Sequence, residues 1–170
     1  KKFGKRNICL IGLMGSGKSV IGKELSKISS MNYFDSDFEI EKESRQSVSQ
    51  IFNKKGESFF RILEEKKCLQ LLEKKDCIIA LGGGSIVNKK IRDKIKKNSY
   101  SIFLNVDINV LTKRLENSNK RPLLKNVNKK TKLKEIFIKR KEYYNSADLI
   151  IENNLKKDRV INIIKEELKI

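Results

Sequence analysis

Short apolar runs alternate along this chain with longer segments in which apolar residues recur at every third or fourth position. The short runs are flanked by polar residues, which is typical of buried strands in a parallel sheet. The longer segments predict amphipathic helices that cover such a sheet. The alternation therefore predicts an α/β fold, with strands at residues 8–11, 32–35, 77–81, 101–104 and 149–151.

Helices are predicted where the helical period is sustained. The first contains Ile21, Leu25 and Ile28 and follows the first strand. Further helices are expected at residues 38–43, 48–53 and 58–72, near Ile91 and Ile95, at 110–115, at 133–144 and at 160–168. Residues 117–130 are polar and irregular, and a loop of this length in a compact domain often serves as a lid.

Composition narrows the class of protein. The chain has 170 residues and no internal repeat or Pro-rich linker, so a single domain spanning residues 1–170 is expected. No apolar run approaches the roughly 20 residues that span a bilayer, so no membrane partner is expected. Cys9, Cys68 and Cys77 lie among apolar neighbours without metal-ligand spacing, which predicts reduced core residues in a cytoplasmic protein. The absence of histidine excludes a histidine-based triad, a histidine zinc site and a histidine general base.

The net charge is +18, from 39 Lys and Arg residues against 21 Asp and Glu residues. Such a balance can indicate nucleic-acid binding. Here the lysines are spread over every segment, and neither an aromatic-rich strand motif nor zinc-finger spacing accompanies them. We therefore interpret the charge as solvated helix faces and expect no nucleic-acid partner. A positive field would also speed the capture of anionic substrates.

A phosphate-binding motif follows the first predicted strand. Residues 12–19 read GLMGSGKS, which matches the pattern G-x-x-x-x-G-K-[ST], and a predicted helix comes directly after it. Glycines allow backbone N–H groups to surround a phosphate at the positive end of the helix. Lys18 can then reach the outer phosphates, and the Ser19 hydroxyl can bind the accompanying Mg²⁺. A glycine-rich turn with a chance lysine is the alternative, but the full motif in this context favours the phosphate site.

Two carboxylates, Asp35 and Asp37, stand at the end of the second predicted strand. A structural alternative is a helix cap, because Ser36 followed by Glu39 fits a capping box. That cap would explain Ser36 but neither aspartate. A kinase with a phosphate-binding loop needs one carboxylate near the metal ion and another to position the acceptor hydroxyl, which favours the functional interpretation.

Arg61 is expected in the first turn of the helix at residues 58–72, where a cation opposes the helix dipole. Glu64 on the same helix face, or Glu57 just before the helix, can brace the guanidinium group. An arginine held in this way can bind a substrate carboxylate through two parallel hydrogen bonds. A surface ion pair is the alternative interpretation.

Arg140 interrupts the apolar stripe of the helix at residues 133–144. Leu133, Ile136, Phe137 and Tyr144 occupy the other positions of that helix face. A buried guanidinium group without an anion is costly, so Arg140 either extends to solvent or meets a negatively charged ligand.

Two further features carry candidate chemistry. Gly82, Gly83 and Gly84 follow the third strand, and three glycines in a row indicate backbone N–H groups that closely approach a ligand. Arg121 lies within the polar loop, and an arginine on a closing lid can neutralise the charge on a transferring phosphoryl group.

Taken together, these motifs closely resemble those of the shikimate kinase family. The matching segments are GLMGSGKS at 12–19, DSD at 35–37, GESFFRILE at 56–64, GGG at 82–84, RPLL at 121–124 and R-x-x-x-Y-x-x-A-D at 140–148. They occur in the family's order and spacing from residue 7 to residue 148. The phosphate-binding loop alone is shared by many kinases, whereas the ordered set is specific.

The resemblance implies a three-layer α/β/α P-loop kinase fold whose five-stranded parallel sheet has the order 2-3-1-4-5. It implies transfer of the ATP γ-phosphoryl group to the 3-hydroxyl group of shikimate, in aromatic amino acid biosynthesis, with Mg²⁺ as cofactor. ATP and shikimate are then the partners of a cytoplasmic monomer, with a lid at residues 117–130 and an acceptor-binding region at residues 35–64.

Residue roles follow from the same resemblance. Asp37 would orient or deprotonate the attacking hydroxyl group, with Lys18 and Arg121 as further catalytic residues. Ser19 and Asp35 would hold the metal ion. The ATP site would comprise Gly15, Ser16, Gly17, Lys18, Ser19, Val20, Arg114 and Arg121, with Arg114 stacked on adenine. Shikimate would contact Asp37, Arg61, Gly82, Gly83, Gly84 and Arg140.

The chain departs from the family pattern at two positions. Val20 stands where the family commonly has threonine, which removes a hydroxyl group near the α-phosphate. Glu142 stands where a proline is common, but Arg140 stays in register with Tyr144. Two rival hypotheses are another P-loop kinase of a small hydroxy acid, such as gluconate kinase, and a regulatory or nucleic-acid-binding P-loop module that has lost catalysis.

Overall fold

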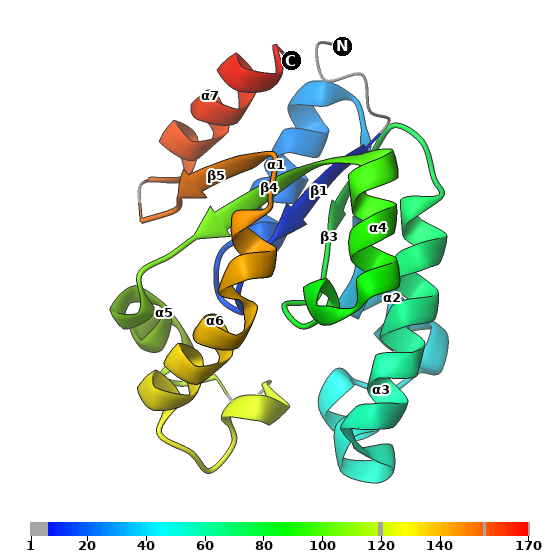
Figure 1. The fold of residues 1–170 in the computed structure, drawn as a ribbon, viewed down its shortest axis with the longest axis vertical. Helices are drawn as coiled ribbons and strands as arrows, with labels where there is room; N and C mark the ends of the chain where they lie inside the picture. The colour runs from blue at the N-terminus through cyan, green and yellow to red at the C-terminus, as the bar shows by residue number, and fades with distance from the viewer. Residues whose placement is uncertain (1–6, 119–120, 155, 170) are drawn as a thin grey trace.

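Five parallel strands form one sheet through the centre of the molecule (Figure 1). The computed structural model describes residues 7–118, 121–154 and 156–169. The strands are β1 Asn7–Ile11, β2 Asn32–Asp35, β3 Cys77–Ala80, β4 Ser99–Asn105 and β5 Leu149–Glu152. Their order across the sheet is β2-β3-β1-β4-β5, and each neighbouring pair is parallel. The implied α/β fold and strand order are confirmed.

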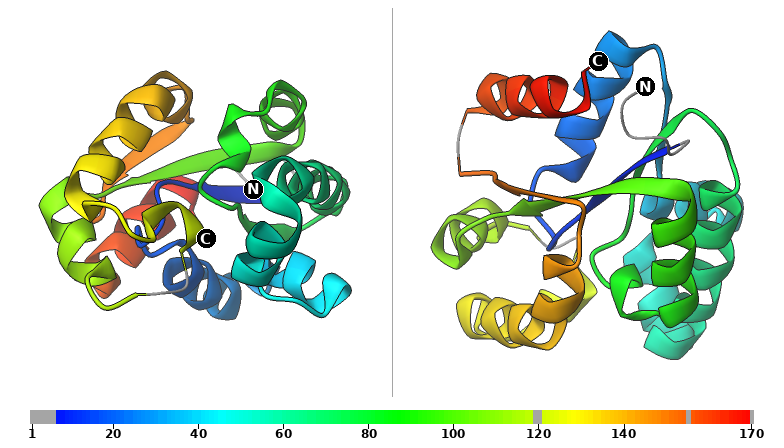
Figure 2. Two further views of the ribbon diagram at one scale, coloured as in Figure 1. Left: turned by 90° about the horizontal axis from the view of Figure 1, so that it is seen from below. Right: turned by 45° about the horizontal axis from the view of Figure 1, so that its top comes forward.

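Helices lie on both sides of this sheet (Figures 1 and 2). They are α1 Lys18–Ser29, α2 Ser36–Ser44, α3 Val48–Leu72, α4 Lys89–Asn98, α5 Ile108–Leu115, α6 Lys129–Asn145 and α7 Lys157–Leu168. Short 3₁₀ turns occur at Ser85–Val87 and Pro122–Leu124. Helices α1 and α7 pack against one face, whereas α3, α4, α5 and α6 share the hydrophobic cluster on the other face. The three layers are therefore helix, sheet and helix.

The side chains of β1 explain why this strand appears in the sequence as one continuous apolar run. Ile8 and Leu10 belong to the hydrophobic cluster shared with α1 and α7, whereas Cys9 and Ile11 belong to the cluster on the opposite face. Successive side chains of a strand point to opposite faces, so a strand covered on both sides favours an unbroken apolar run, here residues 8–11. Because β1 leads directly into residues 12–19, this core fixes the base of the phosphate-binding loop.

A smaller hydrophobic cluster holds α2 against α3. Its buried members are Ile40, Ile51 and Phe60. Gly56, with a φ of 81° and a ψ of 171°, kinks α3 into two arms, and a residue without a Cβ adopts this conformation readily. The sequence predicted separate helices at 48–53 and 58–72, and the structure joins them at this kink.

One apolar position of α1 differs from the sequence expectation. Ile28 is 46% exposed, although its spacing from Ile21 and Leu25 predicted a buried position. It lies in the last turn of α1, beside the chain reversal at Ser30, and outside the cluster that covers this face of the sheet. The helical period continues past the point where the helix contacts the core.

The segment predicted as a lid has some regular structure. It contains the 3₁₀ turn Pro122–Leu124, in which Leu124 is buried, and helix α6 begins before the segment ends, at Lys129. Asn119 and Lys120 of this segment lie outside the described residues. The polar composition therefore indicated a connection, but it did not reveal the apolar anchor within it.

The predicted core cysteines are buried. Cys9, Cys68 and Cys77 carry free thiols in the described part of the chain, and burial raises the pKa of each thiol. Such thiols are poor nucleophiles and act as small apolar side chains. Among the helices of the described residues, none is long and apolar enough to cross a membrane.

Candidate active site

The predicted functional residues meet at the carboxyl ends of the strands, where open parallel sheets bind their ligands. A pocket of about 440 Å³ lies between the phosphate-binding loop, α2 and the glycine segment. Its lining includes Lys18, Ser19, Asp35, Asp37 and Arg121. A smaller cavity of about 60 Å³ adjoins it and is lined by Phe52, Phe60, Arg61, Gly84 and Arg140, among others. Both cavities share Asp37, Gly83 and Arg121, so they form two parts of one site.

The phosphate-binding loop has the backbone conformation that its glycines permit. Gly15 and Gly17 have φ values of 79° and 94°, and α1 begins directly after Gly17. Outside the loop, the amide of Asn153 donates a 2.5 Å hydrogen bond to the carbonyl oxygen of Ser16, and Arg114 Nη1 donates to the carbonyl oxygen of Gly15 at 3.1 Å. These bonds hold loop carbonyls on the outer side, which leaves the N-terminal N–H groups of α1 available for an anion.

Lys18 lies over the loop that precedes it. Its Nζ donates to the carbonyl oxygens of Gly12 and Leu13, each at 2.9 Å. Burial lowers the pKa of Lys18 to about 8, although the carboxylates of Asp37 and Asp35 oppose this effect. A bound phosphate would favour the charged ammonium group, so the amine is ready to accept an anionic ligand.

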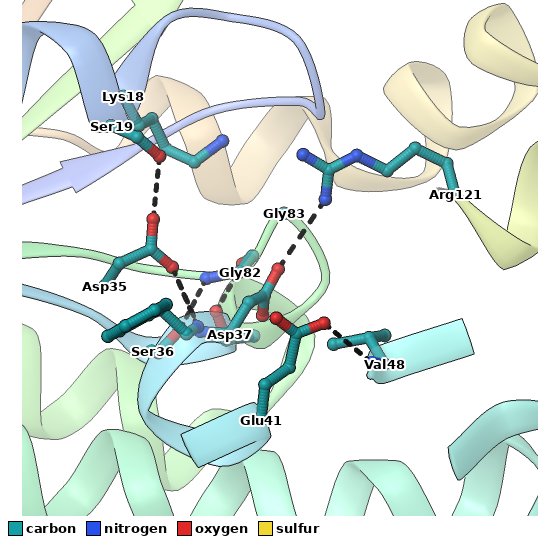
Figure 3. A network of polar contacts seen from close by, with 12 residues as sticks. Lys18, Ser19, Asp35, Ser36, Asp37, Glu41, Val48, Gly82, Gly83 and Arg121 are labelled. Carbon is teal, nitrogen blue, oxygen red and sulfur yellow. Dashed lines mark hydrogen bonds and ion pairs between the residues drawn. The ribbon is translucent and has the colours of Figure 1, made fainter. Parts of the chain in front are cut away.

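Ser19 and Asp35 both line the larger pocket and are joined by a hydrogen bond (Figure 3). Ser19 Oγ donates to Asp35 Oδ2 at 2.7 Å. Asp35 also caps α2, because its Oδ1 accepts hydrogen bonds from the backbone N–H groups of Asp37 and Phe38. A hydroxyl group beside a carboxylate provides the hard oxygen donors that Mg²⁺ prefers.

The capping box that the sequence suggested at Ser36 and Glu39 is wrong. Helix α2 begins at Ser36, so Asp35 is its N-cap. Ser36 is buried, and its Oγ accepts a 2.8 Å hydrogen bond from the backbone N–H of Gly82. The helix starts one residue earlier than the capping box required, which turns the serine toward the glycine segment.

Asp37 lines both cavities of the site. No donor within the described residues hydrogen bonds to its buried Oδ1, while its Oδ2 lies 3.8 Å from Nη1 of Arg121 (Figure 3). Burial raises the pKa of Asp37, and the nearby Asp35 adds to this effect, whereas Arg121 and Lys18 oppose it. Oδ1 packs against the backbone of Gly82, so Oδ2, on the side of Arg121, is the oxygen that a ligand hydroxyl group can approach.

Arg61 is braced as the sequence predicted. Its Nη1 donates to Glu64 Oε2 at 2.7 Å, and its Nη2 donates to Glu57 Oε1 at 2.7 Å. The Glu64 side chain is only 3% exposed, whereas the guanidinium group keeps contact with the small cavity. The two carboxylates therefore fix the arginine beside a space that a ligand can enter.

Arg140 is buried in the apolar stripe of α6, also as predicted. It is 8% exposed, and its Nη1 donates to the carbonyl oxygen of Gly83 at 2.8 Å. The hydroxyl group of Tyr144 donates to the same oxygen at 2.8 Å, and its ring stacks on Phe103 at 4.8 Å. A backbone carbonyl offsets only part of the arginine's charge, so the guanidinium group can still bind an anion.

The glycine segment is explained by space rather than by backbone conformation. A Cβ on Gly82 would lie 2.5 Å from Asp37 Oδ1, and one on Gly84 would lie 2.3 Å from Arg61 Nη1. Side chains of the site therefore pack directly against the glycine backbone. The sequence predicted that a ligand approaches the backbone closely here. The close packing of Asp37 and Arg61 explains Gly82 and Gly84 even without a ligand.

Sequence reasoning did not single out three residues of the site. Asn153 supports the phosphate-binding loop from the end of β5, Glu41 lines the larger pocket from α2, and Phe52 lines the smaller cavity from α3. An asparagine after a strand, a glutamate on a polar helix and an apolar residue on an amphipathic helix have no distinctive local pattern. Only the fold identifies them.

Comparison with known proteins decides the family. The family model described as shikimate kinase matches residues 14–169 of the chain. The chain belongs to the shikimate kinase family. This assignment makes it an ATP-dependent kinase. It argues against both rival hypotheses, a gluconate kinase and a P-loop module that has lost catalysis.

Individual shikimate kinases support the assignment. The enzyme of Bartonella quintana is 41% identical over 155 residues, which cover 91% of this chain and 73% of that protein. The solved structure of shikimate kinase from Acinetobacter baumannii in complex with shikimate has a TM-score of 0.92 at 30% identity and covers 98% of this chain and 94% of that one. The shikimate kinase structure from Aquifex aeolicus has a TM-score of 0.84 at 34% identity, with 96% of each chain covered.

Proposed function

We propose that this shikimate kinase transfers the γ-phosphoryl group of ATP to the 3-hydroxyl group of shikimate, giving ADP and shikimate 3-phosphate. One observation carries the proposal beyond family membership. Asp37 lines both the pocket beside the phosphate-binding loop and the cavity that contains Arg61 and Arg140, and its Oδ2 lies 3.8 Å from Nη1 of Arg121. A hydroxyl group bound to this carboxylate from the cavity would face a phosphate held by the loop.

The phosphate end of the site would bind ATP through the loop and its flanking cations. Backbone N–H groups of Gly15, Ser16 and Gly17 would surround the phosphates, Lys18 would contact the outer ones, and Val20 would lie near the α-phosphate. Arg121 would exchange its long contact with Asp37 for the phosphates. Arg114, which already contacts the loop, would border the adenine.

A magnesium ion fits the same end. Ser19 Oγ and Asp35 Oδ2, 2.7 Å apart, are of the ligand type that Mg²⁺ takes together with substrate phosphates. Ser19 would bind the ion directly and Asp35 through water. When bound, the ion would neutralise charge on the transferring phosphoryl group.

The acceptor end would bind shikimate through its carboxylate and hydroxyl groups. Arg61 and Arg140 would bind the carboxylate together with the backbone of Gly82, Gly83 and Gly84. Phe52 and Phe60, whose ring centroids lie 4.9 Å apart, would contact the apolar part of the ring. Asp37 would accept the hydrogen bond, and then the proton, of the attacking hydroxyl group, which its raised pKa favours.

The same proposal includes the organisation of the chain. The chain would act as a monomeric single domain in the cytoplasm, with residues 35–64 as the acceptor-binding region and residues 117–130 as a lid that brings Arg121 onto the phosphates. ATP and shikimate would be its partners.

The test is magnesium-dependent release of ADP from ATP, measured with shikimate, with gluconate and with neither. The proposal predicts release that depends on shikimate, ignores gluconate and stops when the metal is chelated. Folded protein that binds ATP but releases no additional ADP with shikimate would contradict it.

A further inference from the structure

Glu41 lies on α2 one turn after Asp37, on the same face of the helix. It lines the larger pocket, and its carboxylate lies beside that of Asp37 (Figure 3). Like charges four residues apart in a helix repel each other and destabilise it. A second carboxylate at this position therefore calls for a compensating role, and the proposed reaction gives it none.

The contact that Glu41 makes is with the start of the next helix. Its Oε1 accepts a 2.8 Å hydrogen bond from the backbone N–H of Val48, the first residue of α3 (Figure 3). The first N–H groups of a helix have no partner within the helix and carry its positive dipole end, so a carboxylate is well suited to bind there. Glu41 thus joins α2 to the beginning of α3 across the intervening turn.

The hydrogen bond between Glu41 and Val48 lies beside the small cavity, which Val48 lines. Val48 and Phe52, both on the first arm of α3, line the small cavity together with Asp37. The kink at Gly56 separates this arm from the longer second arm, which packs on the main core through Cys68, Leu71 and Leu72. The position of the first arm therefore depends on its contacts with α2 and on the packing of Phe52 against Phe60 of the second arm.

We propose that Glu41 is a positioning residue for the acceptor substrate, which fixes the first arm of α3 relative to Asp37. The cavity wall formed by Val48 and Phe52 and the carboxylate of Asp37 then form one unit. This inference rests on the proposed function, because it gives the cavity beside Asp37 to shikimate. Glu41 is expected to affect shikimate binding more than ATP binding, because its hydrogen bond is with the start of α3 and not with the phosphate-binding loop.

A second contact between the same helices supplies a matched control. Glu43 on α2 forms an ion pair with Lys67 on the second arm of α3. Glu43 is 58% exposed at its side chain and does not line either part of the site. Removing this pair loosens α2 from α3 without releasing the start of the first arm.

The experiment compares Glu41→Ala, Glu41→Gln and Glu43→Ala with the wild-type enzyme, by steady-state kinetics and by calorimetric titration with shikimate. Glu41→Ala is expected to raise the shikimate KM and Kd by about tenfold, the loss of one charge-assisted hydrogen bond, with the ATP KM within about twofold. Glu41→Gln keeps an oxygen acceptor for Val48 N–H, so its shikimate KM is expected within about threefold of wild type. Glu43→Ala is expected to match wild type in every constant.

Four results would overturn the inference: a wild-type shikimate KM in Glu41→Ala, equal changes in Glu41→Ala and Glu43→Ala, equal rises in the ATP and shikimate KM, or a loss of turnover in Glu41→Gln as large as that in an Asp37 variant. Should Glu41→Ala fail to fold, as judged by circular dichroism, the Gln variant decides alone, because a tenfold rise in its shikimate KM contradicts a positioning role through Oε1. Failure of the proposed function is a separate result, since the wild-type enzyme itself would then not phosphorylate shikimate.

Discussion

The guanidinium group of Arg121 lies 3.8 Å from the carboxylate of Asp37, at the boundary between the two parts of the site. The Arg121 side chain is 42% exposed, and an ion pair this long and this exposed contributes little to stability. Arg121 can therefore leave Asp37 for phosphate at small cost. The pair links the residue proposed to receive the hydroxyl proton with the residue proposed to neutralise the phosphoryl group.

Replacement of Asp37 tests the proton acceptor. Asp37→Asn keeps the size of the side chain but removes the basic oxygen, so kcat is expected to fall by about 10²–10⁴-fold. The ATP KM is expected to change by less than about twofold, because the phosphate-binding loop is untouched. Steady-state kinetics with each substrate varied in turn would check this, and similar losses in kcat and in ATP binding would show that the fold was damaged instead.

Replacement of Arg61 tests the carboxylate site. Arg61→Ala is expected to raise the shikimate KM by about tenfold or more, because a charge-assisted contact with the substrate is lost. It also leaves the buried Glu64 without its ion pair, which is expected to lower the free energy of unfolding by about 2 kcal/mol. Kinetics and urea unfolding measure the two effects separately.

A double variant separates binding from stability at the same position. Glu64→Gln in the Arg61→Ala background removes the unpaired charge, so it is expected to recover part of the stability while the shikimate KM stays high. Recovery of the wild-type KM in the double variant would mean that Arg61 acts on the fold and not on the substrate.

The pH dependence of ATP binding tests the environment of Lys18. Burial lowers the pKa of this amine to about 8 in the free enzyme, and bound phosphates would raise it again. The complex then holds more protons than the free enzyme above that pH, so the ATP Kd is expected to rise as pH increases through 8, by up to about tenfold per pH unit. Calorimetry at fixed magnesium concentration in two buffers of different ionisation enthalpy would report the proton uptake. A Kd that is constant from pH 7 to pH 9 would contradict the depressed pKa.

Hydrogen exchange tests the lid. Amides in residues 117–130 are expected to gain protection when ATP analogue and shikimate are bound together, because closure would remove the loop from water. Helix α4, which lies outside both parts of the site, serves as the internal reference for the same measurement. Unchanged exchange at 121–130 alongside protection of the phosphate-binding loop would rule out closure on ligand binding.

Local patterns carried much of the fold and of the site. The continuous apolar run of β1, the motif that follows it and the helical stripe that contains Arg140 each reflect contacts made by residues close in sequence. The expected brace on Arg61 also lies within one helix, so spacing alone predicted it. The strand order came from family resemblance, because it depends on long-range pairing that hydrophobic periods do not encode.

Contacts between distant segments could not be predicted in this way. The local sequence predicted that Ser36 caps a helix, whereas its hydroxyl oxygen accepts a hydrogen bond from the backbone N–H of Gly82. The bond from Asn153 to Ser16 joins the last strand to the first loop, and the bond from Val48 to Glu41 joins two helices across a turn. Each is decided by how the elements pack, and no residue period marks it.

The most direct measurement is the structure of the reaction product. Phosphorus and proton NMR of the product formed from ATP and shikimate would show which hydroxyl group carries the phosphoryl group. The proposed orientation, with the carboxylate on Arg61 and Arg140 and the attacking oxygen on Asp37, predicts a phosphorus coupling to the proton at carbon 3 alone. A phosphoryl group on another hydroxyl, or unmodified shikimate beside ADP, would contradict the assignment of this site.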